Sequence, residues 1–177
     1  MGRRLGAAIG FLLSLSLAAG AAVAADLQSA TAAYQRGDFR AALAEFQELA
    51  NSGDSQGMMW VGYMYQEGEG TVQDYDEAMN RFRRAADLGE PMANFYIGRM
   101  YANGFGVQKD SLEAARWYRL AAEQGNSYAE LALGQAHEFG IGAPRDIRAA
   151  RRWYQAAADQ GDTDAQAALQ HLTADPE

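Results

Sequence analysis

The chain has 177 residues, no cysteine and a formal net charge of −8 at pH 7, from 23 acidic and 15 basic side chains. The lack of cysteine excludes a disulfide framework and a lipid anchor attached to a cysteine. The acidic balance argues against nucleic acid and anionic membrane surfaces as partners, because both select for lysine and arginine. We expect a chain of this length to fold around a continuous apolar core.

The first segment, residues 1–25, has the three parts of a secretory signal peptide. Arg3 and Arg4 precede a long uncharged apolar run, and a small-x-small cleavage site ends at Ala24 or Ala25. The alternative is a retained membrane anchor, which needs about 20 consecutive apolar residues and a stop-transfer pattern. We predict cleavage, a periplasmic or secreted mature chain, and no stable membrane insertion afterwards. The arginine pair leaves the export route open between the general and twin-arginine systems.

A degenerate repeat is expected next, over residues 26–54, followed by three 36-residue stretches that align without a gap: 55–90, 91–126 and 127–162. The aligned positions include Gly62, Gly98 and Gly134; Gly68, Gly104 and Gly140; Gly70, Gly106 and Gly142; Asp74, Asp110 and Asp146; and Gly89, Gly125 and Gly161. An internal period of this size indicates stacked supersecondary units. Residues 163–177 are expected to form a C-terminal capping helix and a frayed tail.

Each unit is predicted to contain two helices, here called A and B. Apolar residues recur at helical spacing in both halves of a unit. Helix A should end at a left-handed glycine such as Gly68, and helix B should begin at an aspartate N-cap such as Asp74. Asp74 and Glu77 also have capping-box spacing. The stretch Gly104-Phe105-Gly106, which alone resembles a phosphate-binding loop, is therefore predicted to be a turn.

Small and aromatic residues predict how the two helices pack. Gly62 and its equivalents lie inside helix A, where each costs about 1 kcal/mol relative to alanine, and close approach of helix B would offset that cost. Core packing, and not ligand binding, is predicted for the recurring aromatic residues. These are Tyr65, Tyr101, Phe82, Trp117, Tyr118, Trp153 and Tyr154.

The stretches "VGYMYQEGEGTVQDYDEA", "IGRMYANGFGVQKDSLEAARWYRLAAEQG" and "LGQAHEFGIG" resemble Sel1-like repeats, relatives of tetratricopeptide repeats. His137 and Arg81 depart from the pattern, which usually has tyrosine and tryptophan there. The resemblance implies an all-α fold, an α/α solenoid in which antiparallel helix pairs form a right-handed superhelix. It also implies a non-catalytic scaffold that binds other proteins. For exported bacterial members it implies a role in envelope assembly, signalling or regulation.

In tetratricopeptide repeats, helix A forms the inner wall of a concave groove. Transfer of that register predicts partner contacts from nine residues: Gln56, Met59, Tyr63, Gln66, Phe95, Arg99, Leu131, Gln135 and Glu138. A mixed apolar and polar stripe of this kind suits a peptide or helix laid in a groove. Partial burial against the next repeat is the alternative for Met59, Phe95 and Leu131.

Helix B is rich in arginine. Eight of the 15 basic residues lie there: Arg81, Arg83, Arg84, Arg116, Arg119, Arg148, Arg151 and Arg152. A solvated outer face is the simplest interpretation. Contact with an exopolysaccharide or with peptidoglycan, through aromatic residues and this arginine-rich face, remains the alternative function. The sequence leaves the partner and the oligomeric state open.

No residue pattern predicts catalysis, a metal or a cofactor. The two histidines, His137 and His171, are separated in the repeat register, and His137 occupies a tyrosine position. A zinc site would need three or four clustered ligands, and no Walker loop or nucleophile-elbow motif is present. We therefore predict that the protein is not an enzyme.

Overall fold

The computed structural model describes residues 27–174. The predicted signal segment, residues 1–25, lies outside the described residues, as does the end of the predicted tail. Among the described residues, no helix is both long enough and apolar enough to cross a membrane.

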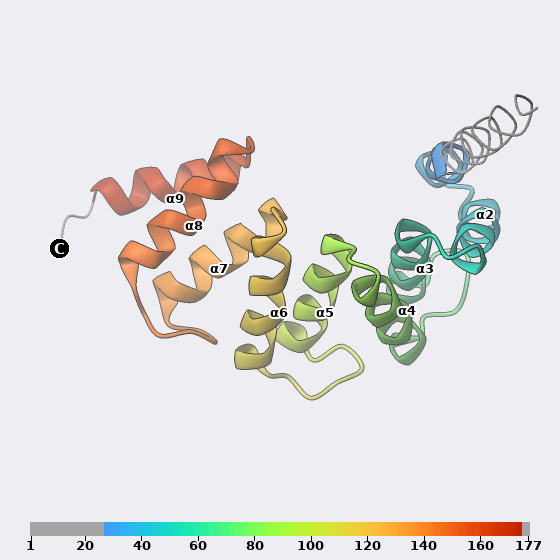
Figure 1. Cartoon of the computed structure of the whole chain (residues 1–177), viewed down its shortest axis with the longest axis horizontal. Coiled ribbons are helices and arrows are strands. Elements are labelled where there is room, and N and C mark those ends of the chain that lie inside the picture. The colour runs from blue at the N-terminus through green and yellow to red at the C-terminus, as the bar shows by residue number, and fades with distance from the viewer. Residues whose placement is uncertain (1–26, 175–177) are drawn as a thin grey trace, which may run out of the picture.

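Residues 27–174 contain helices and no strand. A helix over residues 27–35 is followed by α2 (Phe39–Asn51), α3 (Ser55–Glu67), α4 (Tyr75–Asp87), α5 (Pro91–Asn103), α6 (Ser111–Glu123), α7 (Ser127–Phe139), α8 (Ile147–Asp159) and α9 (Thr163–Ala174). From α2 to α9, each helix packs against the next one along the chain. Figure 1 shows the resulting open arch, with α5 and α6 at its base. This arrangement confirms the all-α solenoid of helix pairs.

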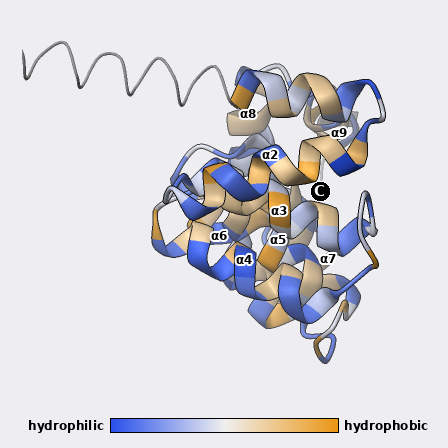
Figure 2. Ribbon diagram, turned by 90° about the vertical axis from the view of Figure 1, so that its right-hand side faces the viewer, coloured by the Kyte–Doolittle hydropathy of each residue, from blue (hydrophilic) through white to orange (hydrophobic). Residues whose placement is uncertain are grey.

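The A helices of the three full units are α3, α5 and α7, and the B helices are α4, α6 and α8. All six have 13 residues. Apolar and hydrophilic residues alternate along them (Figure 2), as expected for helices that bury one face. In addition to its contacts with α4, α3 contacts α5, so A helices of neighbouring units also meet.

Local signals end and begin these helices as predicted. Gly68 is left-handed, with φ of 73°, and its equivalents Gly104 and Gly140 have φ of 77° and 69°. The Oδ1 atom of Asp74 accepts the Glu77 N–H at 2.9 Å. Only this half of the capping box forms, because the Asp74 N–H donates to the Tyr65 carbonyl. The Glu77 carboxylate instead pairs with Arg81 at 2.6 Å.

The glycines inside helix A allow helix B to approach, which confirms the packing prediction. A Cβ atom added at Gly62 would lie 2.8 Å from the Phe82 ring, and one added at Gly98 would lie 2.6 Å from the Tyr118 ring. Side chains do not tolerate such distances, so glycine is required where each A helix crosses the aromatic ring of its B helix.

The core differs between the two ends of the arch. One apolar cluster runs from the helix at residues 27–35 to α5 and includes the fully buried side chains of Phe46, Phe82 and Ile97. Two smaller clusters serve α6 to α9. Eight of their nine buried members are alanine or leucine, and the ninth is Tyr154. The second half of the solenoid is therefore built with smaller side chains.

Candidate partner-binding surface

Six aromatic rings form a continuous row along the first helix and the A helices. We call it the aromatic seam, and its members in spatial order are Tyr34, Trp60, Tyr63, Tyr96, Phe95 and Tyr128. Neighbouring ring centroids lie 5.0, 5.7, 5.5, 5.6 and 5.6 Å apart in that order. None of the six rings is fully buried. The seam therefore joins four helices by aromatic contacts that remain partly open to solvent.

Helical spacing explains why these rings meet. Trp60 and Tyr63 are three residues apart on α3, so they share a face of that helix. On α5, the guanidinium carbon of Arg99 lies 5.6 Å from the ring centroid of Tyr96 and 6.0 Å from that of Phe95. These are cation–π distances. Arg99 thus places a positive charge on the seam, between α3 and α7.

Burial raises the pKa of two seam tyrosines, Tyr34 and Tyr96, above the ordinary value. It raises the pKa of Tyr96 to about 12, against a smaller opposing effect from Arg99. Burial also raises the pKa of Tyr34, and hydrogen bonds with Tyr63 and Glu69 act in the same direction. At neutral pH these phenols are therefore hydrogen-bond donors, and Arg99 supplies the positive charge among the seam contacts.

The structure brings three of the nine predicted contact residues together, namely Tyr63, Phe95 and Arg99. Gln56 and Gln135 are exposed on α3 and α7, and Gln135 lines a cavity beside Tyr118 of α6. Leu131 is half-buried and packs against the cluster of α8 and α9. Leu131 thus packs against neighbouring helices, which was the alternative interpretation of this residue.

Three other predicted residues are held by the protein itself. Met59 is buried in the first core cluster. Gln66 is only 1% exposed and its Nε2 atom donates to Glu67 at 2.7 Å. Glu138 accepts a hydrogen bond of 2.6 Å from the Tyr154 hydroxyl, which ties α7 to α8. Met59 and Gln66 are corrections to the transferred register, because their side chains face the core and not the solvent.

Tyr34 and Tyr128 of the seam are not among the nine predicted contacts, and neither are Trp60 and Tyr96, which share one repeat position. The latter two lie 36 residues apart, one residue after Met59 and Phe95. The recurrence of a large aromatic residue at that position was a usable signal. In the third unit the position is Ala132, which broke the pattern.

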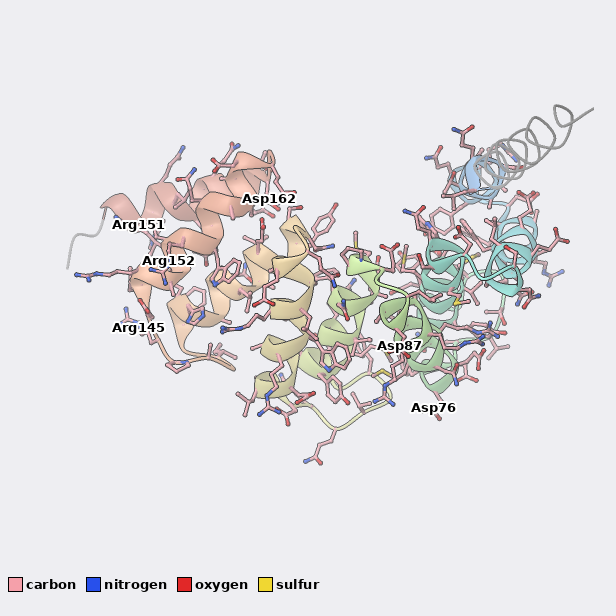
Figure 3. The ribbon with its side chains drawn as sticks, viewed as in Figure 1. Asp76, Asp87, Arg145, Arg151, Arg152 and Asp162 are labelled. Atoms are coloured by element: carbon pink, nitrogen blue, oxygen red, sulfur yellow. The ribbon has the colours of Figure 1, made fainter. Side chains whose placement is uncertain are left out.

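The arginine-rich B helices form a separate, mostly exposed surface. Arg81 pairs with Glu77 and Arg116 pairs with Glu113, one helical turn away in each case. Figure 3 shows Arg145, Arg151 and Arg152 near α8, and Asp76 and Asp87 on α4. Charges of both signs occur on these helices, which is typical of a solvated face.

The described residues contain no group of three or more histidine, cysteine or acidic side chains that could hold a metal ion. His137 is buried, and its Nδ1 atom lies 3.1 Å from the Pro144 carbonyl oxygen. His171 is exposed on α9. The two histidines thus lie on different helices, one buried and one exposed.

Comparison with known proteins identifies the repeats. The family model described as "Sel1 repeat" matches residues 55–90, 91–126 and 127–162, which together are more than half of the chain. A search of curated proteins found no match.

Solved structures agree with this match. The crystal structure of a Sel1 repeat protein from Oxalobacter formigenes is 33% identical, with a TM-score of 0.74, over 83% of this chain and 62% of that one. The protective antigen c5321 of uropathogenic Escherichia coli, which has an SLR fold, is 35% identical with a TM-score of 0.73, over 87% and 34% of the two chains. The Helicobacter pylori cysteine-rich protein B, at 20% identity and a TM-score of 0.61, shares the fold. The present chain thus spans less than two thirds of the first two proteins.

Proposed function

The chain belongs to the Sel1 repeat family, and from that premise we propose that it is an exported adaptor whose aromatic seam binds a segment of a partner protein. Sel1 repeat proteins are generally non-catalytic scaffolds for protein interactions. In this proposal the chain works in the bacterial envelope and uses the seam to bind its partner. The observation that carries it is the row of partly exposed rings across four helices.

The chemistry of the seam defines the partner segment. Tyrosine and tryptophan offer large, rigid contact areas at low entropic cost, which is why they dominate protein-binding hot spots. Arg99 adds one positive charge, held over two rings. A segment with apolar side chains and a carboxylate opposite Arg99 would complement this surface.

The envelope location rests on the composition of residues 1–25, which have the features of a secretory signal. An exported chain without cysteine would not depend on disulfide formation in an oxidising compartment. We therefore place the proposed interaction in the periplasm or outside the cell.

The alternative function, contact with envelope glycan, has less support from the geometry. It would combine aromatic residues with arginines of the B helices, but the seam belongs to the first helix and the A helices. Trp117, an aromatic residue on a B helix, has its indole nitrogen buried away from solvent. A glycan would have to contact two different surfaces to use both sets of groups.

The proposal is tested by photo-crosslinking in the native host. A photoreactive amino acid is placed at position 63 or 99 on the seam, and at position 84 on α4 as the control. We expect one recurrent protein to be captured from the two seam positions and not from position 84.

A matched pair of charge reversals then separates specific binding from general charge effects. Arg99→Glu should weaken binding of the captured protein by about tenfold or more, since its cation–π and ion-pair contacts are lost. Arg84→Glu changes net charge equally but lies on the exposed face of α4, so binding should remain within about twofold. Equal losses in both variants would refute the seam as the binding surface.

A further inference from the structure

The junctions between successive repeats use equivalent residues in different ways. A junction is the place where helix B of one unit meets helix A of the next. At the second junction, between α4 and α5, five core-facing positions carry Tyr75, Met79, Phe82, Tyr96 and Met100. The same positions at the third junction, between α6 and α7, carry Ser111, Ala115, Tyr118, Ala132 and Ala136. Four large side chains are thus replaced by small ones.

At the first two junctions, a ring from helix A covers a ring from helix B. Trp60 stacks on Phe46 with centroids 5.1 Å apart and an interplanar angle of 6°. Tyr96 stacks on Phe82 with corresponding values of 5.0 Å and 10°. A third stack, between Tyr75 and Phe105, covers the loop side of the second junction at 5.3 Å.

The third junction lacks the covering ring. Tyr118 occupies the position of Phe46 and Phe82, but the residue opposite it is Ala132. A cavity of about 490 Å³ lies there, lined by Tyr118, Ala132, Ala115 and Ala136, among others. Ser111 and Ile141, which replace the Tyr75–Phe105 pair, also line it.

We propose that this cavity is a socket for one aromatic side chain, a tryptophan or tyrosine, of the partner segment. The inserted ring would lie flat on Tyr118, as Trp60 lies on Phe46 and Tyr96 lies on Phe82. The inference rests on the proposed function, since it adds an anchor to the same binding surface. The partner would thus complete the third junction as the chain itself completes the first two.

The socket is continuous with the seam. Phe95, a member of the seam, lies 5.8 Å from the Tyr118 ring that forms one wall of the cavity. Phe95 also contacts Tyr128 at the end of the seam, at 5.6 Å. The contact between Phe95 and Tyr118 therefore joins the seam directly to the cavity wall.

The lining favours an aromatic occupant with a polar edge. Alanine is the most frequent residue of the walls, and Tyr118 offers a ring for stacking. Phe139 and Ile141 line the cavity while 62% and 60% exposed, so the site opens to solvent between two apolar residues. Gln135 and Lys109 also line it. The Gln135 amide oxygen can accept a hydrogen bond from an indole N–H or a phenol hydroxyl, and the Lys109 ammonium can donate one to a phenol oxygen. Buried aromatic anchors in such pockets dominate many interfaces.

The test uses side-chain analogues in place of the unidentified partner. Indole and p-cresol are titrated into the full mature chain, with NMR detection of alanine and isoleucine methyl groups. We expect saturable binding with Kd on the order of 1 mM, as for small fragments. The largest shifts should fall on Ala115, Ala132, Ala136 and Ile141. The saturated analogue 4-methylcyclohexanol, similar in size to p-cresol, should bind at least about threefold more weakly because it cannot stack on Tyr118.

A filling variant supplies the internal control. Ala132→Tyr installs the residue that the preceding repeat has at this position, and should reduce indole affinity by about tenfold or more while raising the midpoint of thermal unfolding. Ala167→Tyr, on the exposed face of α9, should leave indole affinity unchanged. If Ala132→Tyr fails to fold, Ala115→Met fills the same cavity from helix B and must produce the same loss of binding.

Unsaturable or dispersed shifts, or full binding by the filled variant, would overturn the socket. The outcome is separable from the proposed function, because the analogues do not depend on a partner. If indole does not bind but positions 63 and 99 still cross-link a protein, the socket is rejected and the seam is retained. Indole binding without those cross-links would support the socket and reject the seam.

Discussion

The two halves of the solenoid have the same repeat but different interiors. From the helix at residues 27–35 to α5, one cluster with buried phenylalanine, methionine and isoleucine side chains holds the helices together. From α6 to α9, two smaller clusters contain mainly alanine, with Tyr154 as the largest fully buried side chain. The B helices α4, α6 and α8 have the same length and the same aspartate N-cap in both halves. The repeat therefore fixes the backbone, while the size of the core side chains varies along it.

This difference predicts unequal stability. Each methylene group removed from water contributes about 0.8 kcal/mol, so an alanine-lined junction gains less from burial than an aromatic one. In repeat proteins, stability is approximately a sum of unit terms and interface terms between neighbours. We expect the first half to hold the fold and the second half, with its open junction, to adapt to a partner.

The largest expected effect comes from removing a ring in the first half. Phe82 is fully buried and stacks on Tyr96. Phe82→Ala should lower the free energy of unfolding by about 4 kcal/mol, through lost burial and a cavity. Urea unfolding followed by circular dichroism measures it. Leu133→Ala, at a fully buried site of the second half, should cost about 2–3 kcal/mol, and a larger loss there than at Phe82 would contradict the comparison.

Hydrogen exchange compares the local stability of the two halves without a mutation. Amides of α7, α8 and α9 should exchange at least about tenfold faster than those of α3, α4 and α5, which corresponds to about 1.4 kcal/mol less protection. The measurement is native-state hydrogen exchange with mass spectrometry. Uniform protection from α3 to α9 would mean that the alanine-rich clusters hold their helices as firmly as the aromatic cluster.

Helix caps should behave alike in both halves. Asp74 and Asp146 each accept a backbone N–H three residues later, at 2.9 and 3.0 Å. Asp74→Ala and Asp146→Ala should each cost about 1 kcal/mol, and replacement by asparagine should recover most of the loss. Thermal unfolding of the four variants checks this. A cost at one position only would show that the halves differ in their caps as well as their cores.

The smallest expected effect is on the pH dependence of the stability of the second half, at Glu130. Burial raises the pKa of Glu130, and nearby Asp159 acts in the same direction, against a hydrogen bond from Gln160. Because the pKa of Glu130 is higher in the folded state, its protonation stabilises the fold at pH values below its pKa in the unfolded chain, about 4.3. This stabilisation is lost as pH rises through the pKa of the folded state. The Glu130→Gln variant cannot lose this stabilisation. Its free energy of unfolding, relative to that of the natural chain, should therefore increase between pH 4 and pH 7.

The control for this prediction is Glu123→Gln, which changes an exposed carboxylate at the end of α6. Its stability relative to the natural chain should not depend on pH over the same range. Unfolding with urea at several pH values gives both comparisons. A flat profile for Glu130→Gln would show that its carboxylate is as well solvated in the folded chain as in the unfolded one.

Local signals made much of the fold predictable from the sequence. Left-handed glycines and aspartate caps act within a few residues, and Gly62 and Gly98 mark where an aromatic ring of helix B must pass. The seam was harder to predict, because it depends on which face of each A helix meets the next. The register transferred from a related repeat family placed Met59 and Gln66 on the surface, whereas the structure buries both.

The cavity at the third junction was harder still. Ala115, Ala132 and Ala136 are ordinary helix residues when considered singly, and only their comparison with Met79, Tyr96 and Met100 reveals missing volume. The physical reason is that a cavity is a property of facing positions on two helices, and their pairing across the junction comes from the three-dimensional structure.

We propose that the partner lies on the aromatic seam. Hydroxyl-radical footprinting of the chain, with and without the protein captured by cross-linking, tests this claim most directly. We predict that modification of Tyr63, Tyr96 and Tyr128 falls in the complex, while modification of the exposed Leu88 and Leu120, which lie on the side of the B helices, stays unchanged. Protection of Leu88 and Leu120, with the three tyrosines as reactive as before, would contradict the claim.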